Sequence, residues 1–391
     1  MYSLLLVIIY IAFISLGLPD SLLGSAWPVM HTQFGVPLSY AGIVTMIIAG
    51  GTIVSSLMSD RLTRKLGAGL VTAISVMLTA VALFGFSISG SLAHLCLWAI
   101  PYGLGAGAVD AALNNYVALH YATRHMSWLH CFWGVGAAVS PFIMSSCLVN
   151  GWGWSSGYRA VAGIQIVLTA ILFISLPLWK RRPLSNTGRE TSAAALSLPQ
   201  AVKIRGVKYV LLAFFGYCGL ETTTGLWASS YLVRYRGIDA ETAARFASLF
   251  YLGITFGRFL CGFIAERVGD KRLVRFGILT IMIGVGLVGL PAGVNISALL
   301  GLVVIGLGCA PVYPSLIHAT PSNFGRENSQ SIIGIQMASA YIGSTFMPPL
   351  FGLIADHSTI GVYPAYLIFF AILMLWTSEK LTRVIAKSNC Q

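Results

Sequence analysis

Three carboxylates stand inside long apolar runs, where a charge is costly. Asp20, Asp110 and Glu221 are the three of the twelve Asp and Glu residues that lie neither in a predicted loop nor at a predicted helix end. A charged side chain at the centre of a bilayer costs at least about 2.5–3.5 kcal/mol. A desolvated carboxyl group holds its proton more tightly, so it can load and release a proton as its exposure changes. We predict proton coupling at these residues, with sodium as an open alternative because carboxylates also bind that cation.

Asp110 shares one helical face with two glycines and an amide. Gly103, Gly107, Asp110 and Asn114 follow one another at positions i, i+4, i+7 and i+11. Small residues allow a neighbouring helix to approach, and the acid–amide pair offers hydrogen bonds to a polyol or a site for a proton. The alternative is an interhelical hydrogen bond that only holds the bundle together.

Asp20 and Glu221 occupy matching places in the two halves of the chain. Asp20 follows Pro19, which would leave a backbone carbonyl without its helical hydrogen bond beside the acid. Asp20 could instead cap a helix that restarts after the proline. Glu221 and Gly225 repeat Asp20 and Gly24 with the same spacing, so we predict that Glu221 is the second half's counterpart of Asp20.

Aromatic and amide side chains within the apolar runs are placed as expected for a sugar-sized cavity. An aromatic face stacks on the C–H face of a sugar ring, while amides and acids bind its hydroxyl groups. His130 and Trp133, about one helical turn apart, form the best pair. Each such side chain could instead anchor at a membrane interface or pack against another helix. The predicted substrate-binding residues are Asn114, Trp27, His130, Trp133, Tyr217, Trp227, Tyr313 and Gln336.

The composition requires that these residues be carried by membrane-spanning helices. The chain has 391 residues, of which 57% are apolar and 9% charged, whereas soluble domains carry roughly 25% charged residues. Apolar runs of about 20 residues are long enough to span a bilayer as helices. The first run has no basic stretch before it and is predicted to be a spanning helix rather than a signal peptide. The predicted spans are 2–30, 41–59, 67–88, 92–119, 128–149, 160–179, 207–233, 243–265, 273–291, 296–318, 329–354 and 362–379.

The distribution of basic residues predicts the orientation. With both termini cytoplasmic, 19 of the 24 Lys and Arg residues fall on the inner side of the membrane, as the positive-inside rule requires. We expect a multi-pass protein of the plasma membrane, in a bacterium the inner membrane, that acts as a monomer. The basic residues are scattered between the apolar runs, which argues against a nucleic-acid partner.

Cysteine and nucleophile patterns do not indicate an enzyme. The seven cysteines show no pair at metal-ligand spacing, and six of them lie in apolar runs. No nucleophile–base pair is recognisable either. We therefore expect no catalytic residue, no metal and no cofactor, and we give a membrane-embedded enzyme or a sensor the third place among function classes.

The sequence repeats itself across a basic central segment. The segment Asp60–Lys65 after the second span corresponds to Gly262–Arg272 after the eighth. Three further correspondences pair Gly103–Gly105 with Gly306–Gly308, Gly136 and Pro141 with Gly343 and Pro348, and Gly17–Leu18 with Gly219–Leu220. We predict an N-terminal half over 1–179, a cytoplasmic linker over 180–206 and a C-terminal half over 207–391. Two parallel six-helix halves are a transporter architecture with the substrate site between them near the midplane.

This pattern resembles the major facilitator superfamily. The acidic-basic signature follows both the second and the eighth span, although Ser56 and Thr63 stand where the family pattern has glycine. The fourth span, with Gly103, Gly105, Asp110 and Asn114, resembles the fucose–galactose–glucose:proton symporter branch. The resemblance implies that Asp20 and Asp110 match positions used for proton coupling and sugar binding. Asp110 is one methylene shorter than the branch's usual Glu, and Ala111 replaces its usual Thr.

Charges near the predicted cytoplasmic ends of the spans are interpreted as gating and packing charges. Arg258 lies four and eight residues before Gly262 and Glu266, so it can snorkel to the interface or pair with Glu266. The alternative is positive-inside anchoring. The predicted gating residues are Asp60, Arg61, Arg64, Arg258, Glu266 and Arg267.

Together these features predict an all-α membrane protein of 12 transmembrane helices in two pseudo-symmetric six-helix halves. The leading function is secondary active transport by alternating access, as proton-coupled uptake of a neutral monosaccharide. Proton-driven efflux of drugs or small metabolites is the alternative, since acids in a wide, aromatic-lined cavity would serve either task.

Overall fold

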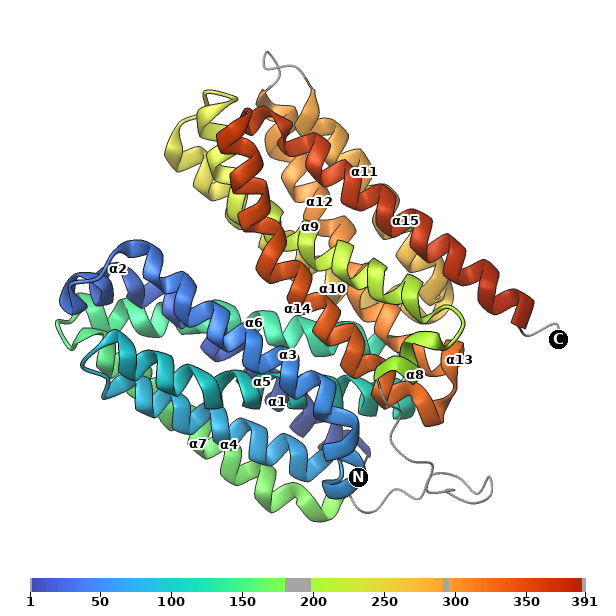
Figure 1. Ribbon diagram of the computed structural model, residues 1–391, viewed down its shortest axis with the longest axis horizontal. Helices are drawn as coiled ribbons and strands as arrows, with labels where there is room; N and C mark the ends of the chain where they lie inside the picture. Colours follow the sequence, from blue (N-terminus) through green and yellow to red (C-terminus); the bar gives the residue numbers. More distant parts are fainter. Residues whose placement is uncertain (1, 180–197, 291–294, 389–391) are drawn as a thin grey trace. The chain divides into compact units, whose positions relative to one another are not determined.

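The computed structural model describes residues 2–179, 198–290 and 295–388, and all regular structure within them is helical (Figure 1). Residues 180–197 of the predicted linker lie outside the described residues, whereas 198–203 form a short helix. The helices of the first half are α1 (Tyr2–Asp20), α2 (Leu22–Phe34), α3 (Ala41–Leu66), α4 (Ala68–Ser87), α5 (Leu92–His120), α6 (Thr123–Val149) and α7 (Gly153–Trp179), with η1 (Leu38–Tyr40) before α3. Those that follow are α8 (Leu198–Lys203), α9 (Val207–Arg234), α10 (Ala240–Val268), α11 (Asp270–Gly289), α12 (Asn295–His318), α13 (Thr320–Phe324), α14 (Arg326–His357) and α15 (Tyr363–Ser388), with η2 (Ile360–Val362) before α15.

Within the described residues, twelve long helical segments carry the predicted spans. Eleven of them are long and apolar enough to cross a membrane, with α1 and α2 counted as one segment over Leu4–Phe34. The twelfth is α9, which has 28 residues. The fold is that of an all-α membrane protein with two six-helix halves, as predicted.

The first span is broken where the sequence places its proline and its acid. Pro19 has no backbone N–H to continue the helical ladder, and α1 ends one residue later at Asp20. Ser21 precedes α2, which ends at Phe34 and is followed by Gly35 in a left-handed conformation with φ of 64°. The acid therefore lies at a helix end inside the membrane-spanning segment.

Helices run further than hydropathy predicts where charged residues follow the apolar run. The third helix continues to Leu66 instead of ending at 59, and α15 continues to Ser388 instead of 379. Lys, Arg and Glu are good helix formers. They stop the apolar run but not the helix, because the helix can project beyond the hydrocarbon core.

The repeated glycines make the same helix crossing in each half. A side chain at Gly136 of α6 would clash with the carbonyl oxygen of Ile14 in α1, and one at Gly343 of α14 would clash with that of Phe215 in α9. Likewise Gly103 faces the carbonyl of Ile48 in α3, and its repeat Gly306 faces that of Phe250 in α10. Close backbone approach through small residues is how helices associate in membranes.

The chain divides into two compact units. The first lies within Met1–Tyr116 and Phe132–Ser197, and the second within Val117–Cys131 and Leu198–Gln391. The C-terminal end of α5 and the start of α6 thus belong to the second unit. The predicted division at 180–206 was made from sequence alone and stays a prediction.

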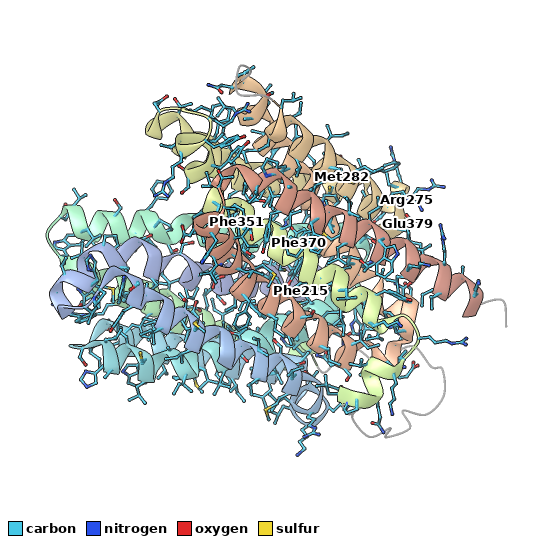
Figure 2. The ribbon with its side chains drawn as sticks, turned by 45° about the horizontal axis from the view of Figure 1, so that its top comes forward. Phe215, Arg275, Met282, Phe351, Phe370 and Glu379 are labelled. Atoms are coloured by element: carbon cyan, nitrogen blue, oxygen red, sulfur yellow. The ribbon has the colours of Figure 1, made fainter. Side chains whose placement is uncertain are left out.

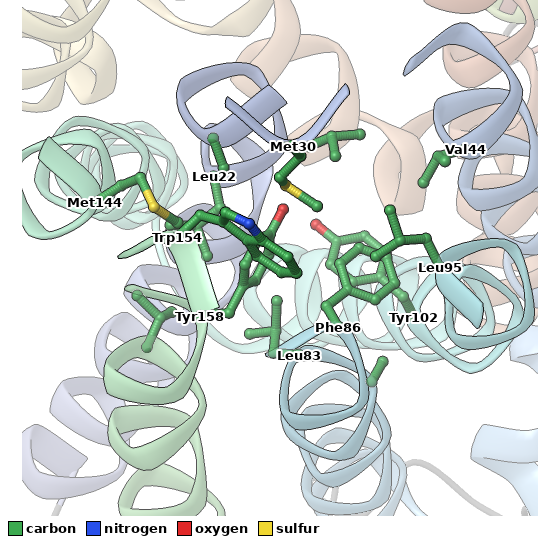
Figure 3. Packing of buried hydrophobic residues seen from close by; sticks show 14 of the residues in the cluster. Leu22, Met30, Val44, Leu83, Phe86, Leu95, Tyr102, Met144, Trp154 and Tyr158 are labelled. Carbon is green, nitrogen blue, oxygen red and sulfur yellow. The ribbon is translucent and has the colours of Figure 1, made fainter. Parts of the chain in front are cut away.

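An aromatic core packs α4, α5 and α7 of the first unit against one another (Figure 3). Phe86 of α4 stacks with Tyr102 of α5 at 6.3 Å between ring centroids and meets Tyr158 of α7 edge-on at 5.5 Å. Trp154 packs edge-on against Tyr158 at 6.0 Å. Burial of such rings contributes strongly to packing energy. Tyr102 packs within this core, and its hydroxyl group is directed to Asp20 of the first span.

We expect the Gly136→Ala variant to be strongly destabilised. The added methyl group must push α1 away from α6, because the atom it meets is backbone and cannot change rotamer. Overpacking typically costs about 1–3 kcal/mol, and we expect the upper end of that range in thermal unfolding of the detergent-solubilised protein. The matched control is Gly50→Ala in α3, where a methyl group meets nothing within 4 Å. Equal melting temperatures for the two variants would contradict the close crossing.

Candidate functional site

Asp20 is held by two hydrogen-bond donors from different helices. The Tyr102 hydroxyl group of α5 donates to Oδ1 at 3.2 Å, and the Trp133 indole N–H of α6 donates to Oδ2 at 2.9 Å. The Tyr102 side chain is buried, whereas Asp20 itself is exposed. Both carboxylate oxygens thus accept hydrogen bonds from neutral donors, and the carboxyl group remains exposed.

Asp110 and Asn114 form one hydrogen-bonded unit on α5. The Asn114 side-chain amide donates to Asp110 Oδ1 at 2.7 Å and to the Asp110 carbonyl at 3.0 Å. Both residues are buried. The face they occupy continues from Gly107, where the backbone of α5 approaches Thr52 and Ser56 of α3. The predicted shared face is therefore present, with the acid and amide one turn apart on it.

Glu221 lies next to a buried arginine in the second unit. Glu221 Oε2 of α9 is 3.9 Å from the Arg258 guanidinium of α10, and the two side chains are 16% and 5% exposed. A second guanidinium contact, at 3.5 Å, goes to the Tyr217 hydroxyl group, which itself donates to the Cys309 carbonyl of α12 at 3.1 Å. Three helices are joined around this buried ion pair, in which each charge compensates the other.

Tyr313 of α12 is the centre of an aromatic group beside that pair. Its ring meets His130 of α6 edge-on at 4.8 Å, and Tyr217 and Phe214 lie at 5.6 and 5.1 Å between centroids. The Tyr313 hydroxyl group contacts the Met337 sulfur at 3.2 Å. Three of the predicted binding residues, His130, Tyr217 and Tyr313, are therefore brought together within the second unit.

The other predicted binding residues are placed separately. Trp27 is 4% exposed and belongs to the apolar core of the first unit. Trp227 donates its indole N–H to the Pro348 carbonyl at 2.9 Å. Gln336 is fully buried and accepts a hydrogen bond from Thr320 at 3.0 Å. Trp133, in contrast, lies directly at the Asp20 carboxylate.

The predicted gating charges fall into three settings. Asp60 and Arg64 form an ion pair at 2.8 Å within α3. Arg61 and Arg267 are exposed at the ends of α3 and α10. Glu266 pairs with Arg124 at 3.1 Å, while Arg258 pairs with Glu221. Arg258 and Glu266, which the sequence places on one helical face, thus have different partners.

Several side chains that form these polar contacts were not predicted from the sequence. Tyr102 and Arg124 follow no charge or repeat pattern that would single them out. His318 ends α12 and lies 2.7 Å from an Asp270 carboxylate oxygen through Nδ1, while Nε2 is 3.2 Å from the Tyr121 carbonyl. Such partners come from distant parts of the chain, so a single sequence carries no signal for them.

Residues 117–131 are joined to the rest of the second unit by several polar contacts. Besides Arg124 with Glu266, the Trp128 indole N–H donates to the Phe259 carbonyl at 3.3 Å. Arg326 of α14 donates to the Leu119 carbonyl at 3.0 Å. These contacts join the turn between α5 and α6 to α10 and α14.

Known proteins with similar sequences extend over nearly the whole chain. Bypass of stop codon protein 6 of Saccharomyces cerevisiae is 23% identical over 405 aligned residues, which cover 94% of this chain and 80% of that protein. The glucose/mannose transporter GlcP of Bacillus subtilis is 21% identical over 390 residues, covering 96% and 94%. Both alignments include the two halves.

The fold is also found in solved structures. The crystal structure of FucP, a fucose:proton symporter of E. coli, superimposes with a TM-score of 0.79 at 16% identity and covers 96% of this chain and 98% of its own. The Major Facilitator Superfamily profile matches residues 9–244 and 209–380, which together include every membrane-spanning helix in whole or in part. The chain therefore belongs to the Major Facilitator Superfamily of transporters.

Proposed function

We propose that this transporter couples the uptake of a neutral monosaccharide to the movement of protons by alternating access. The observation that carries the proposal is the Asp20 site, where a carboxylate inside a spanning segment is bound by a phenol and an indole. The acid supplies a site for a proton and an acceptor for sugar hydroxyl groups. Trp133 supplies an aromatic ring at the same place. Small-molecule sites typically combine an aromatic surface with a small number of polar groups.

The sugar class is supported by the relatives. GlcP is a glucose/mannose transporter, and FucP is a fucose:proton symporter. The buried charges also favour a neutral substrate. Because Glu221 and Arg258 already compensate each other, an ionic substrate would have to compete with an existing partner for either group.

Asp20, Asp110 and Glu221 are proposed to take part in proton coupling. Asp20 is the accessible member, whereas Asp110 is bound to Asn114 and Glu221 to Arg258. A carboxylate that gains a proton loses its hold on a cationic or amide partner, which links protonation to helix packing. The remaining predicted binding residues, His130, Tyr217 and Tyr313 above all, are proposed to contribute aromatic and hydroxyl surface.

The polar contacts of residues 117–131 are proposed to open and close during the transport cycle. Alternating access requires contacts between the helices of the two sequence halves that exist in one state and not in the other. Two of the observed contacts join residues from different sequence halves: the ion pair of Arg124 with Glu266, and the hydrogen bond from Arg326 to the Leu119 carbonyl. The protein is proposed to act as a monomer in a bacterial inner membrane with both termini cytoplasmic.

Transport by reconstituted protein tests the proposal. Labelled hexoses, deoxyhexoses and cationic dyes are offered to proteoliposomes with an inward proton gradient, an inward sodium gradient or no gradient. We expect proton-dependent accumulation of one sugar by the wild type and none by Asp110→Asn, because the amide does not ionise and so cannot load and release a proton. Asp356→Asn removes an exposed acid at the end of α14 and should accumulate the sugar normally.

Each other outcome changes the proposal. Dye movement against the proton flow without sugar uptake would establish the efflux alternative. Accumulation driven by the sodium gradient would identify sodium as the coupling ion in place of the proton. Normal accumulation by Asp110→Asn would remove Asp110 from the coupling role.

A further inference from the structure

A basic cavity lies where α8, α9 and α15 meet. Its volume is about 550 Å³, and its lining comes from the turn between α8 and α9, the first residues of α9 and the last turn of α15. These parts lie together in the second unit because α9 packs against both α8 and α15 (Figure 1). The cationic lining residues are Lys203, Arg205, Lys208 and Lys387.

Among the described residues that line this cavity, none is an acid that could compensate these charges. Four like charges repel one another even near a surface, where solvent reduces the interaction. The start of α9 adds to the positive potential, because Gly206 precedes the helix without a side-chain cap and also lines the cavity. The positive-inside rule explains the presence of cations on this side. It does not explain their gathering around one hollow, which an anion would stabilise.

Aromatic residues place the cavity at the depth of the lipid headgroups. Tyr209 lines it and meets Trp376 of α15 edge-on at 6.0 Å, with the Lys208 ammonium group 5.2 Å from the Tyr209 ring centroid. Trp376 is 49% exposed. Trp and Tyr gather at the boundary between the hydrocarbon core and the headgroups. The ammonium and guanidinium groups are therefore within reach of lipid phosphates.

An apolar stripe leads along α15 toward the cavity. Phe369 and Ile372 are 60% and 53% exposed, and with Trp376 they fall three and four residues apart on one helical face. This face ends about two to three turns before Val384 and Lys387, which line the cavity. Acyl chains can lie on the stripe while the headgroup occupies the basic hollow. A free anion would use only the hollow.

We propose that this cavity binds the phosphate headgroup of an anionic phospholipid, whose acyl chains lie along Phe369, Ile372 and Trp376. Basic pockets at the membrane surface between spanning helices are suited to such headgroups. The bound phosphate partly offsets the four lining charges, and the lipid connects the start of the second half to the last helix. This site is separate from Asp20, Asp110 and Glu221, so the inference does not depend on the transported substrate.

Titration of delipidated, detergent-solubilised protein tests the site. Dioleoylphosphatidylglycerol is added in mixed micelles, and binding is followed by native mass spectrometry together with thermal unfolding. Dioleoylphosphatidylcholine and inorganic phosphate are titrated in parallel. The variants are Lys203→Gln/Arg205→Gln/Lys208→Gln and the matched control Lys65→Gln/Arg272→Gln/Lys380→Gln, which removes three exposed cations outside this cavity.

We expect saturable binding of phosphatidylglycerol by the wild type and the control. Each removed cation should weaken it roughly fivefold, so the cavity variant should lose on the order of 100-fold in affinity. Trp376→Ala should weaken lipid binding and leave phosphate binding unchanged.

Three results would overturn the proposal. Equal losses in the cavity variant and the control would reduce the effect to general surface charge. Equal affinity for phosphatidylcholine would exclude recognition of a negative headgroup. Saturation by inorganic phosphate with the affinity of the lipid, and no effect of Trp376→Ala, would assign the hollow to a free anion.

Discussion

Replacing Asp20 by Asn should reduce gradient-driven accumulation to the level of protein-free vesicles. The amide oxygen can still accept hydrogen bonds from Tyr102 or Trp133, so the local packing should survive. The amide cannot ionise, however, and the proposed coupling requires a group that gains and loses a proton. We therefore expect that exchange of labelled for unlabelled substrate without a gradient persists while accumulation against a gradient disappears.

The neighbours of Asp20 provide the controls for this result. Tyr102→Phe removes one donor but keeps the carboxyl group, so accumulation should continue with a shifted pH dependence. Asp356→Asn, which removes an exposed acid, should behave as the wild type. If Asp20→Asn accumulates substrate normally, the coupling proton is carried elsewhere.

Replacing Glu221 by Gln should strongly destabilise the protein, because it leaves the Arg258 guanidinium buried beside a neutral amide. Removing one partner of a buried ion pair costs about 3–5 kcal/mol. The Arg258 side chain is only 5% exposed and so cannot recover its hydration without moving the helix. Chemical or thermal unfolding in detergent measures the loss.

The double variant Glu221→Gln/Arg258→Gln separates charge from packing. It leaves no unpaired charge, so most of the lost stability should return. The exposed pair between Arg275 of α11 and Glu379 of α15, at 2.6 and 2.8 Å, is the matched comparison (Figure 2). Breaking it with Glu379→Gln should cost about 1 kcal/mol or less, since surface pairs contribute little. A double variant as unstable as Glu221→Gln would show that the Glu221 carboxylate acts through contacts other than Arg258.

Much of the fold was predictable because membrane helices obey one simple constraint. Every backbone polar group in the hydrocarbon core must be bonded internally, so an apolar run of sufficient length has to be a helix. The repeated glycines were also informative, since Gly136 and Gly343 contact the first helix of their own sequence half, α1 and α9 respectively. The errors lie at helix ends such as Leu66 and Ser388, where hydropathy marks the membrane boundary and not the end of the helix.

The site was predictable only in part. An acid in an apolar run is conspicuous in a sequence, and Asp20, Asp110 and Glu221 were identified in that way. Their partners were predictable only when they lay one turn away, as Asn114 does from Asp110. Tyr102 and Arg258 reach their acids across helix–helix contacts, and the distance between two helices is not encoded in the hydropathy of either.

The polar character of α9 has a consequence for how the protein is made. In the part of the chain that the structure describes, α9 is a long helix that lacks the apolarity of the other eleven segments, because Glu221 and three adjacent threonines interrupt it. A central acid opposes transfer from the insertion machinery into lipid by about 2.5–3.5 kcal/mol. Arg258, which compensates this acid, is synthesised only afterwards, in α10. The seventh span should therefore wait at the insertion machinery until α10 emerges, and the two helices should enter the bilayer as a pair.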